Sequence, residues 1–340
     1  MPSPTLVIQT AFLGDVVLTT PLLSALAERH GPVDVVTTPV AAPLLETHPA
    51  VANVIPYDKR GTARGWDGLR SLARRLKANR YERAYLPHRS LRTAALALLA
   101  GIPSRVGFSG GWSFLYTEAR PKPRNGHETD RLLALANRAA GVYPPLLRPT
   151  AEDDQAVTEL LDMLGNVEKT FIAIAPGSIW GSKRWPYYAE LAARLTDHSA
   201  IVVVGGSGDV GFGDEIQRAA TGGNGRQRVV NACGKLTLRQ SAALIGQAAL
   251  LVTNDSAPLH LATAMGTQVV ALFGPTVTEF GFGPLRAGDV ALGLDGLQCR
   301  PCSPHGPPRC PLGHHRCMRE LTVEAVTRVI EDIGALRRRS

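Results

Sequence analysis

Three short segments of the 340-residue chain carry side chains that could do chemistry, and each directly follows an apolar run. In the first, residues 11–21 (AFLGDVVLTTP), Asp15 comes after Gly14. A glycine permits a tight turn between a strand and a helix, and a carboxylate at the start of that helix could act as a general base. The same carboxylate could instead cap the helix by accepting backbone N–H bonds. The spacing alone leaves both roles open.

The second segment, residues 175–186 (APGSIWGSKRWP), has the composition of a phosphate-binding loop. Gly177 and Ser178 follow the apolar run, and Lys183 and Arg184 stand just before an expected helix. Backbone N–H groups and cations placed in this way hold phosphate oxygens. The residues do not follow the order Gly-x-x-x-x-Gly-Lys-Ser/Thr, so ATP hydrolysis of the P-loop type gains no support. An ordinary strand-to-helix loop is the alternative interpretation.

The third segment, residues 254–266 (NDSAPLHLATAMG), also begins where a strand is expected to end. Asp255 and Ser256 can cap the helix that follows, and the free N–H groups and dipole of such a helix favour an anion. His260 falls in the first turns of this helix. A single histidine is more often a structural residue, but at this distance from the Asp-Ser pair it could reach the same anion.

A fourth pattern points to a different cofactor. Residues 206–211 read Gly-x-Gly-x-x-Gly after an expected strand, which is typical of a nicotinamide dinucleotide site. No acidic residue stands about twenty positions later to hold a ribose hydroxyl. A dehydrogenase is therefore disfavoured, and the glycines are expected to shape a turn near a nucleotide.

Four of the five cysteines gather late in the chain, at Cys299, Cys302, Cys310 and Cys317, with three histidines among them. The first pair has the Cys-x-x-Cys spacing of a metal site, and the remaining spacings are irregular. Zinc binding is therefore the less favoured interpretation. The chain shows no secretory signal, so the thiols are expected to be reduced unless a structural disulfide forms. No catalytic role is assigned to them.

The composition is that of a globular protein, with 44% hydrophobic and 19% charged residues, which disfavours disordered and fibrous classes. The net charge of +8 belongs to the first half: residues 1–150 hold 19 Lys and Arg against 10 Asp and Glu, and residues 151–340 hold 18 against 19. The excess suggests an anionic partner, which could be nucleic acid, a phosphorylated glycolipid or a membrane surface. The alternative interpretation is a basic helix face around residues 69–83 that simply faces water. No uncharged apolar run is long enough to span a membrane, which favours a cytoplasmic location.

Strands and helices are expected to alternate along the whole chain, which is the pattern of a parallel α/β sheet. A Pro-rich stretch at residues 143–149 precedes the acidic residues 152–154, and we place a domain boundary near residue 150. Two doubly wound domains follow, and in such sheets ligands bind beyond the carboxyl ends of the strands. The expected strands are residues 5–9, 33–37, 83–86, 171–175, 201–204, 250–253 and 268–273, and the expected helices are 21–29, 68–77, 93–100, 187–195, 240–245 and 259–265.

The three segments, in this order, resemble the ADP-heptose:lipopolysaccharide heptosyltransferases of bacteria over essentially the whole chain. Residues 310–318 (CPLGHHRCM) also look like the cysteine-bearing tail of the heptosyltransferase II group, which adds the second heptose of the inner core. The resemblance implies an α/β protein of the GT-B fold, in which two Rossmann-like domains face each other across a cleft. Residues 1–150 would bind the acceptor and residues 151–321 ADP-heptose. A final helix at 322–338, within the segment 322–340, would cross back to the first domain.

The resemblance also implies the roles of individual site residues. Asp15 matches the catalytic base, with Gly14 beside it on the acceptor side, and Lys183 matches the lysine that binds the diphosphate. Leu236 falls where the adenine is lined. The other donor-binding positions are Gly177, Ser178, Asp255, Ser256, Ala257 and His260.

Such an enzyme would catalyse one inverting displacement, in which Asp15 removes the proton of the acceptor hydroxyl as its oxygen attacks the anomeric carbon. Lys183 and the N–H groups after Asp255 would neutralise the leaving ADP, so neither a metal ion nor another cofactor is expected, and the chain contains no Asp-x-Asp motif. The basic half would bind the anionic acceptor at the inner face of the cytoplasmic membrane. Contributions are expected from Arg60, Arg64, Arg89 and Arg92.

Three alternative functions remain. A transferase of the same family with another acceptor, of the heptosyltransferase I or III type, would use the same Asp15 chemistry. A nucleotide-sugar epimerase on a similar fold would need no basic acceptor surface. A nucleic-acid-binding protein is disfavoured, because the basic segment carries no zinc-finger, RNP or helix-turn-helix signature.

Overall fold

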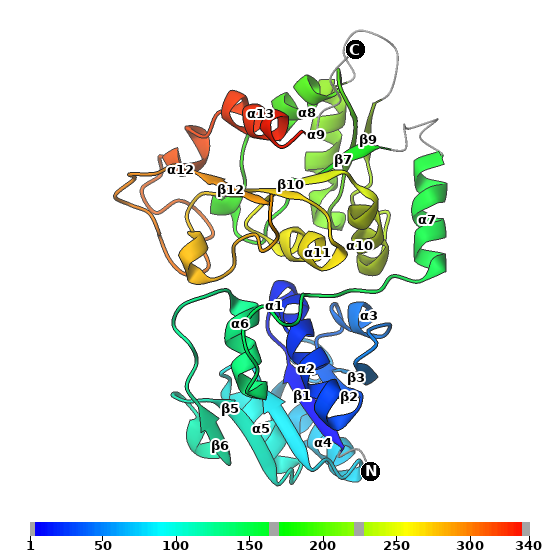
Figure 1. The fold of residues 1–340 in the computed structure, drawn as a ribbon, viewed down its shortest axis with the longest axis vertical. Coiled ribbons are helices and arrows are strands. Elements are labelled where there is room, and N and C mark those ends of the chain that lie inside the picture. Colours follow the sequence, from blue (N-terminus) through cyan, green and yellow to red (C-terminus); the bar gives the residue numbers. More distant parts are fainter. Residues whose placement is uncertain (1–3, 163–169, 221–227, 335–340) are drawn as a thin grey trace. The chain divides into compact units, whose positions relative to one another are not determined.

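The computed structural model describes residues 4–162, 170–220 and 228–334, and the chain divides into two compact units, Met1–Arg148 and Pro149–Ser340. Each unit holds one parallel six-stranded sheet with helices on both of its faces (Figure 1). Among the described helices, none combines the length and the apolarity that crossing a membrane requires.

The sheet of the first unit has the strand order β3-β2-β1-β4-β5-β6. Because side chains alternate along a strand, Leu6 and Ile8 of β1 pack under α4 and α5, while Val7 packs under α2 and α6. The strands are β1 (Thr5–Gln9), β2 (Val33–Thr37), β3 (Val51–Pro56), β4 (Arg83–Leu86), β5 (Ser104–Phe108) and β6 (Glu118–Arg120). The helices are α1 (Leu13–Leu18), α2 (Thr20–His30), α3 (Ala42–Leu45), α4 (Gly65–Ala78), α5 (Leu91–Leu99) and α6 (Glu128–Leu133), with short 3-10 helices η1 (Ser113–Leu115) and η2 (Ala134–Ala136).

The sheet of the second unit has the order β12-β11-β10-β7-β8-β9. Ile172 and Ile174 of β7 pack against α8 and α13, and α10 and α11 lie on the other face (Figure 1). The strands are β7 (Phe171–Ala175), β8 (Ala200–Val203), β9 (Val229–Asn231), β10 (Leu250–Asn254), β11 (Val269–Phe273) and β12 (Val290–Gly293). The helices are α7 (Ala151–Asp162), η3 (Gly181–Lys183), α8 (Tyr188–Leu195), η4 (Ser207–Asp209), α9 (Val210–Ala220), α10 (Leu238–Gln247), α11 (Ala257–Met265), η5 (Thr278–Phe280), α12 (Arg316–Arg319) and α13 (Val323–Asp332).

Each sheet has one point where the strand order reverses. In the first unit this switch point lies between β1 and β4, and in the second it lies between β7 and β10. Doubly wound sheets bind their ligands beyond the carboxyl ends of the strands at this point, because the flanking loops diverge to opposite faces there. Residues 11–21 follow β1, residues 175–186 follow β7 and residues 254–266 follow β10. All three segments singled out from the sequence therefore lie at a switch point.

Every strand expected from the sequence, and every expected helix between residues 21 and 265, is present with ends displaced by at most three residues, whereas the helix expected at 322–338 ends at Asp332. The strands that the sequence pattern did not reveal are β3, β5, β6, β9 and β12. Three of these, β3, β6 and β12, have few buried residues, so they lack the apolar run that marks a buried strand.

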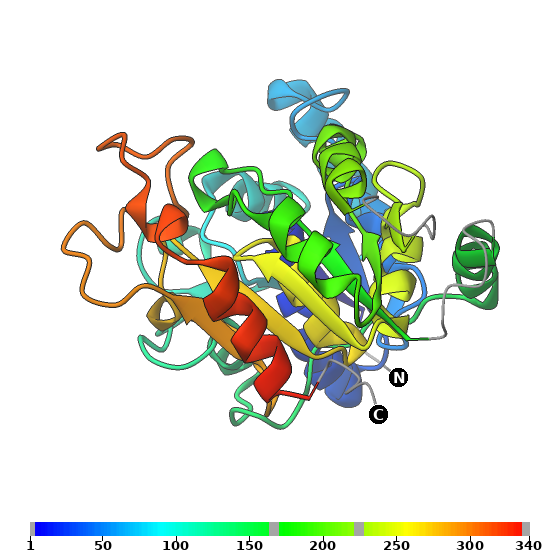
Figure 2. The same ribbon diagram turned by 90° about the horizontal axis from the view of Figure 1, so that it is seen from above.

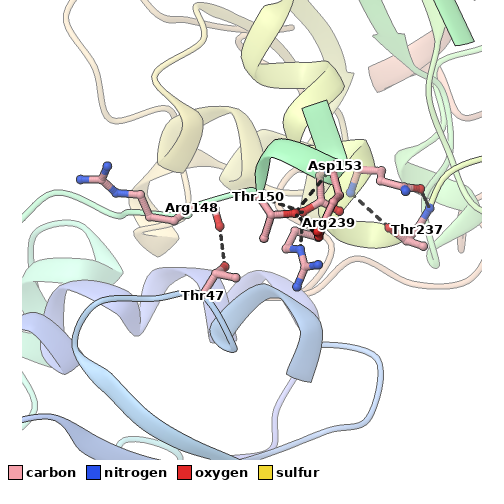
Figure 3. A network of polar contacts seen from close by, with 8 residues as sticks. Thr47, Arg148, Thr150, Asp153, Thr237 and Arg239 are labelled. Carbon is pink, nitrogen blue, oxygen red and sulfur yellow. Dashed lines mark hydrogen bonds and ion pairs between the residues drawn. The ribbon is translucent and has the colours of Figure 1, made fainter. Parts of the chain in front are cut away.

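The residues on either side of the unit boundary are each held by their own unit (Figure 3). In the first unit, the hydroxyl of Thr47 donates to the carbonyl oxygen of Arg148. In the second, the carboxylate of Asp153 accepts the backbone N–H of Thr150 at 2.8 Å and Nε of Arg239 at 2.5 Å. Pro149, whose ring fixes one backbone dihedral, lies between these two held positions.

The last described helix, α13, packs on α8 within the second unit (Figures 1 and 2). Val323, Val326 and Ile330 are buried in the core that also contains Leu191 of α8. Residues 335–340 lie outside the described part of the chain. The expected passage of the 322–338 segment toward the first domain stays a prediction.

Candidate functional site

The switch point of the second unit brings a buried ion pair together. Nζ of Lys183, in η3 after β7, lies 2.6 Å from Oδ2 of Asp255, which follows β10. Both side chains are only 9% exposed. The hydroxyl of Thr276, which follows β11, donates to the same carboxylate oxygen at 2.6 Å. Three adjacent strands thus each supply one polar group, and the carboxylate fixes the position of the ammonium group.

Asn254, a residue that the sequence analysis did not single out, holds the 175–186 loop against β10. Its side chain is fully buried. Oδ1 accepts the backbone N–H of Trp185 at 3.1 Å and the hydroxyl of Tyr188 at 3.0 Å, and Nδ2 donates to the carbonyl of Pro176 at 2.8 Å. The only sequence signal for this role is an amide at the end of an apolar strand.

The first part of the 175–186 loop is compact. The carbonyl oxygen of Ser178 accepts Nε and Nη2 of Arg184 at 2.9 and 2.7 Å. A Cβ at Gly177 would lie 2.3 Å from Oδ1 of Asp209, so a larger residue would displace that side chain. Asp209 belongs to the Gly-rich segment 206–211 and accepts the N–H of Gly206 at 3.0 Å. The Gly-rich segment therefore packs beside the loop that carries Lys183.

The remaining donor-site candidates lie at the start of α11 and in the turn after β9. Ser256 is the N-cap of α11, which begins at Ala257, but its side chain makes no capping hydrogen bond. His260 is buried, with its ring edge-to-face against Phe282 at 6.4 Å between centroids. Leu236 is half-buried just before α10. The expectation that Asp255 caps α11 is not met, because its carboxylate binds Lys183 and Thr276 instead.

Residues 305–315, within the late cysteine segment, pack beside Lys183. Gly306 has a φ of +76°, and a Cβ there would lie 3.1 Å from Cε of Lys183. The hydroxyl of Ser182 donates to the carbonyl of Pro307, and Nε2 of His315 lies 2.7 Å from the carbonyl of Ser182. These contacts tie residues 305–315 to the loop that bears the lysine.

The four late cysteines are free thiols, as is Cys233. Burial raises the pKa of Cys317 to about 11, and its neighbours Cys302, Cys310 and Cys299 act in the same direction. Burial likewise raises the pKa of Cys302, helped by Cys299 and Cys310. The four thiols therefore lie near one another, and those of Cys302 and Cys317 are protonated at neutral pH. Within the described ranges, no three His, Cys, Asp or Glu side chains are grouped so as to hold a metal ion.

At the switch point of the first unit, Asp15 lies within α1 and is half-buried. Its Oδ2 accepts the backbone N–H of Phe12 at 3.1 Å, so the carboxylate does cap its own helix. Gly14 lies inside α1 rather than in the turn before it. The capping bond and a catalytic role are compatible, because a carboxylate has several acceptor sites on its two oxygens.

Two basic side chains that were not predicted individually lie just beyond the carboxyl ends of β1 and β4. Nζ of Lys59 donates to the carbonyl and hydroxyl of Thr10, at the end of β1, at 2.5 and 3.3 Å. Burial lowers the pKa of His88, which follows β4, and the charges of Lys59 and Lys122 lower it further. Nδ1 of His88 is buried without a hydrogen-bond partner among the described residues. The carboxyl edge of this sheet is thus cationic.

The four predicted acceptor arginines differ in burial and in hydrogen bonding. Arg92 is half-buried and donates through Nε to the hydroxyl of Tyr57 and through Nη2 to the carbonyl of Gly65, both at 2.6 Å. Arg60, Arg64 and Arg89 are exposed. Arg92 therefore also holds the loop before α4, and the contribution of all four arginines to acceptor binding stays a prediction.

Comparison with known proteins gives a consistent result. Residues 69–308 match the sequence model of glycosyltransferase family 9 (heptosyltransferase). The chain is 32% identical over 322 residues to lipopolysaccharide heptosyltransferase 2 of Salmonella typhimurium, covering 85% of this chain and 92% of that protein. It is 30% identical over 366 aligned residues to lipopolysaccharide heptosyltransferase 2 of Escherichia coli, covering 97% of each. The solved structure of E. coli ADP-heptose lps heptosyltransferase II matches with a TM-score of 0.77 at 27% identity, over 97% of this chain and 98% of that one.

Proposed function

Because the chain belongs to glycosyltransferase family 9, the heptosyltransferase family, we propose that it moves L-glycero-D-manno-heptose from ADP-heptose to the heptose/Kdo inner core of lipopolysaccharide, as a heptosyltransferase II. The observation that carries this proposal is the buried Lys183–Asp255 pair at the switch point of the second sheet. An ammonium group held there is suited to a diphosphate. Two relatives that are at least 30% identical, and that match this chain over more than nine-tenths of their own length, are lipopolysaccharide heptosyltransferases 2, which supports this donor and this kind of acceptor.

Lys183 stabilises the leaving group in this proposal. An ammonium group can donate three hydrogen bonds, so Lys183 can keep its bond to Asp255 and still donate to a phosphate oxygen of ADP. The backbone of Gly177 and Ser178 and the start of α11, at Ser256 and Ala257, add N–H groups, with His260 in the next turn. Leu236 lines the adenine. These groups neutralise charge as it develops on ADP, without a metal ion.

Asp15 is the catalytic base in this proposal. It takes the proton of the acceptor hydroxyl, and the oxygen of that hydroxyl forms a bond to the anomeric carbon of heptose. The bond between that carbon and the diphosphate oxygen breaks, ADP leaves with the electron pair, and the anomeric configuration inverts. The hydrogen bond from Phe12 fixes the direction of the carboxylate, which favours proton transfer from one position.

The acceptor is a phosphate- and carboxylate-bearing lipid sugar, and the cationic edge of the first unit supports its binding there. Lys59 and Lys122 lie close enough to His88 to lower its pKa. Arg60, Arg64 and Arg89 are exposed on the same unit and are proposed to contact the acceptor. An acceptor of this kind places the reaction at the inner face of the cytoplasmic membrane.

A second member of the same class is the nearest alternative. A heptosyltransferase of type I or III would use the same donor groups and the same base on another acceptor hydroxyl. The chain is also similar to a type I enzyme: it is 28% identical over 315 residues to lipopolysaccharide heptosyltransferase 1 of Pseudomonas aeruginosa. A nucleotide-sugar epimerase is disfavoured, since it would not need the cationic edge of the first unit.

The test is a transfer assay with ADP-heptose and two acceptors, lipopolysaccharide that carries one heptose and lipopolysaccharide that carries none. We expect product and ADP release with the first acceptor only, and loss of both in Asp15→Asn. Asp332→Asn, an exposed carboxylate at the end of α13, is the matched control. Transfer to the heptose-free acceptor would instead establish type I activity, and full activity of Asp15→Asn would exclude Asp15 as the base.

A further inference from the structure

Apart from Phe12, which is 40% exposed, the first unit exposes three large aromatic side chains, on α4 and on the loop between β5 and β6. Trp66 is 63% exposed, Trp112 43% and Phe114 74%. Trp66 is in the first turn of α4, after β3, and the other two stand in the loop between β5 and β6. Exposed apolar groups that gather in this way mark a surface that binds a partner.

Contacts within the unit hold these segments close together. Nη2 of Arg92, in α5, donates to the carbonyl of Gly65, which directly precedes Trp66. Helix α5 packs against both α4 and η1. Tyr116 lies at the end of the loop between β5 and β6 that bears Trp112 and Phe114, here called the aromatic loop. It packs against the same core cluster as α4 and α5. The rings of Trp112 and Phe114 lie edge-to-face, with centroids 6.1 Å apart. Helix α5 therefore links the two segments that bear the aromatic residues.

The same elements carry an excess of positive charge. Helix α4 buries Leu69, Leu72 and Leu76 and exposes its basic side chains, with Asp67 as the one acidic residue of the helix. Arg64 precedes the helix, and Arg89 precedes α5. The exposed basic residues of α4 are Arg70, Arg74, Arg75 and Lys77.

The exposed aromatic rings and the basic side chains together favour one kind of binding partner over others. Aromatic rings settle at the boundary between headgroups and acyl chains, and arginine and lysine bind anionic headgroups while their stems stay in apolar surroundings. A second copy of the chain would bring like charges together, which disfavours pairing through this surface. A single-stranded nucleic acid could also stack on aromatic residues, but the proposed acceptor is anchored in a lipid membrane.

We propose that Trp66, Trp112 and Phe114, with the exposed arginines of α4, form a docking surface for an anionic lipid bilayer. The inference rests on the proposed function in that a lipid-linked acceptor requires access to a membrane. Trp66 stands at the start of the helix that follows β3, so it lies at the same carboxyl edge of the sheet as Asp15, whereas η1 leads into β6 from the opposite edge. Docking through Trp66 would bring the carboxyl edge, with Asp15 and Lys59, to the headgroup layer.

The test is sedimentation of the whole protein with phosphatidylcholine vesicles that contain or lack phosphatidylglycerol. We expect binding to the anionic vesicles, weakened about tenfold in Trp66→Ser, Phe114→Ser and by a similar factor in Arg70→Gln, Arg74→Gln. Leu312→Ser is the control for the first pair, since Leu312 is 63% exposed in the second unit. Arg218→Gln, Arg328→Gln is the control for the second, with both arginines exposed there.

Several results would overturn the proposal. One is equal vesicle binding by the surface variants and their controls. Another is tighter binding to single-stranded RNA than to anionic vesicles, lost in Trp66→Ser, Phe114→Ser. A third is self-association of the native chain that these substitutions abolish. Transfer to a water-soluble, deacylated acceptor separates the two proposals: we expect it to be unchanged in Trp66→Ser, Phe114→Ser. If neither the native protein nor any variant transfers heptose, but vesicle binding still depends on the aromatic and arginine residues of the docking surface, only the proposed function is wrong.

Discussion

The ammonium nitrogen of Lys183 and the carboxylate oxygen Oδ2 of Asp255 lie 2.6 Å apart, although 72 positions separate the two residues along the chain. Both side chains are buried, and Thr276 donates to the same oxygen. Removing one member of a buried pair leaves the other charge without compensation, whereas replacing both with apolar groups can be nearly neutral. The contribution of this pair to stability can therefore be separated from its contribution to donor binding.

We expect Lys183→Met to lower the free energy of unfolding by about 3 kcal/mol, because Asp255 loses its counter-ion. The double variant Lys183→Met, Asp255→Leu should recover most of that stability while ADP-heptose binding stays lost. Urea denaturation measures the first quantity and isothermal titration with ADP-heptose the second. Native donor affinity in the double variant would show that Lys183 does not bind the diphosphate.

Asn254 is expected to be as important for stability as the charged pair. Asn254→Leu removes the acceptor of Trp185 N–H and Tyr188 O–H and the donor to the Pro176 carbonyl, all at buried positions. Leaving such groups unpaired should cost about 3 kcal/mol in the free energy of unfolding. Asn53→Ala is the control, because Asn53 makes an exposed bond to Asp34 and its loss should cost less than about 0.5 kcal/mol. A comparable loss in both variants would argue against this role of Asn254.

The positions of the three chemical segments could be predicted from the sequence because their signals are local. Each follows a short apolar run, and a parallel α/β sheet places the ends of such runs at one edge. Asp15, Lys183 and Asp255 were all located in this way. The interactions of the side chains could not be predicted, because they depend on strand order. Asp255 was expected to cap α11, but a buried carboxylate is more stable beside a cation, and β7 brings Lys183 next to it.

The basic segment is a second case in which the sequence does not predict the contacts of the side chains. Lys59, Arg64 and Arg92 belong to one cationic stretch of the sequence, and charge alone does not distinguish them. In the folded unit, Lys59 reaches the end of β1, Arg64 is exposed, and Arg92 binds Tyr57 and Gly65. Their different surroundings come from contacts between residues far apart in the sequence.

The two neighbouring arginines Arg89 and Arg92 are therefore expected to behave differently. Arg92→Ala should lower the free energy of unfolding by about 2 kcal/mol, because it removes hydrogen bonds to Tyr57 and Gly65. Arg89→Ala removes an exposed side chain and should change it by less than about 0.5 kcal/mol. In the transfer assay, Arg89→Ala should raise the acceptor KM and leave the donor KM unchanged. An unchanged acceptor KM would remove Arg89 from the acceptor site.

His48 should make the stability of the first unit depend on pH. Its side chain is buried, and burial, helped by the charge of Arg148, lowers its pKa from 6.5 to about 4. Nδ1 accepts the N–H of Ala50 at 3.2 Å, which suits a neutral ring. Since the unfolded chain takes up the proton first, this contribution to stability is complete above pH 6.5 and is lost as the pH falls toward 4. The total loss is about 3 kcal/mol.

His48→Gln is therefore expected to flatten the decline in unfolding free energy between pH 6.5 and 4, measured by urea denaturation at a series of pH values. His198→Gln is the matched control, because His198 is exposed and its substitution should leave the pH profile unchanged. Some slope should persist in His48→Gln, since burial also lowers the pKa of His30 and of His88. If His48→Gln and native protein lose stability in parallel over this range, His48 is not the main titrating group.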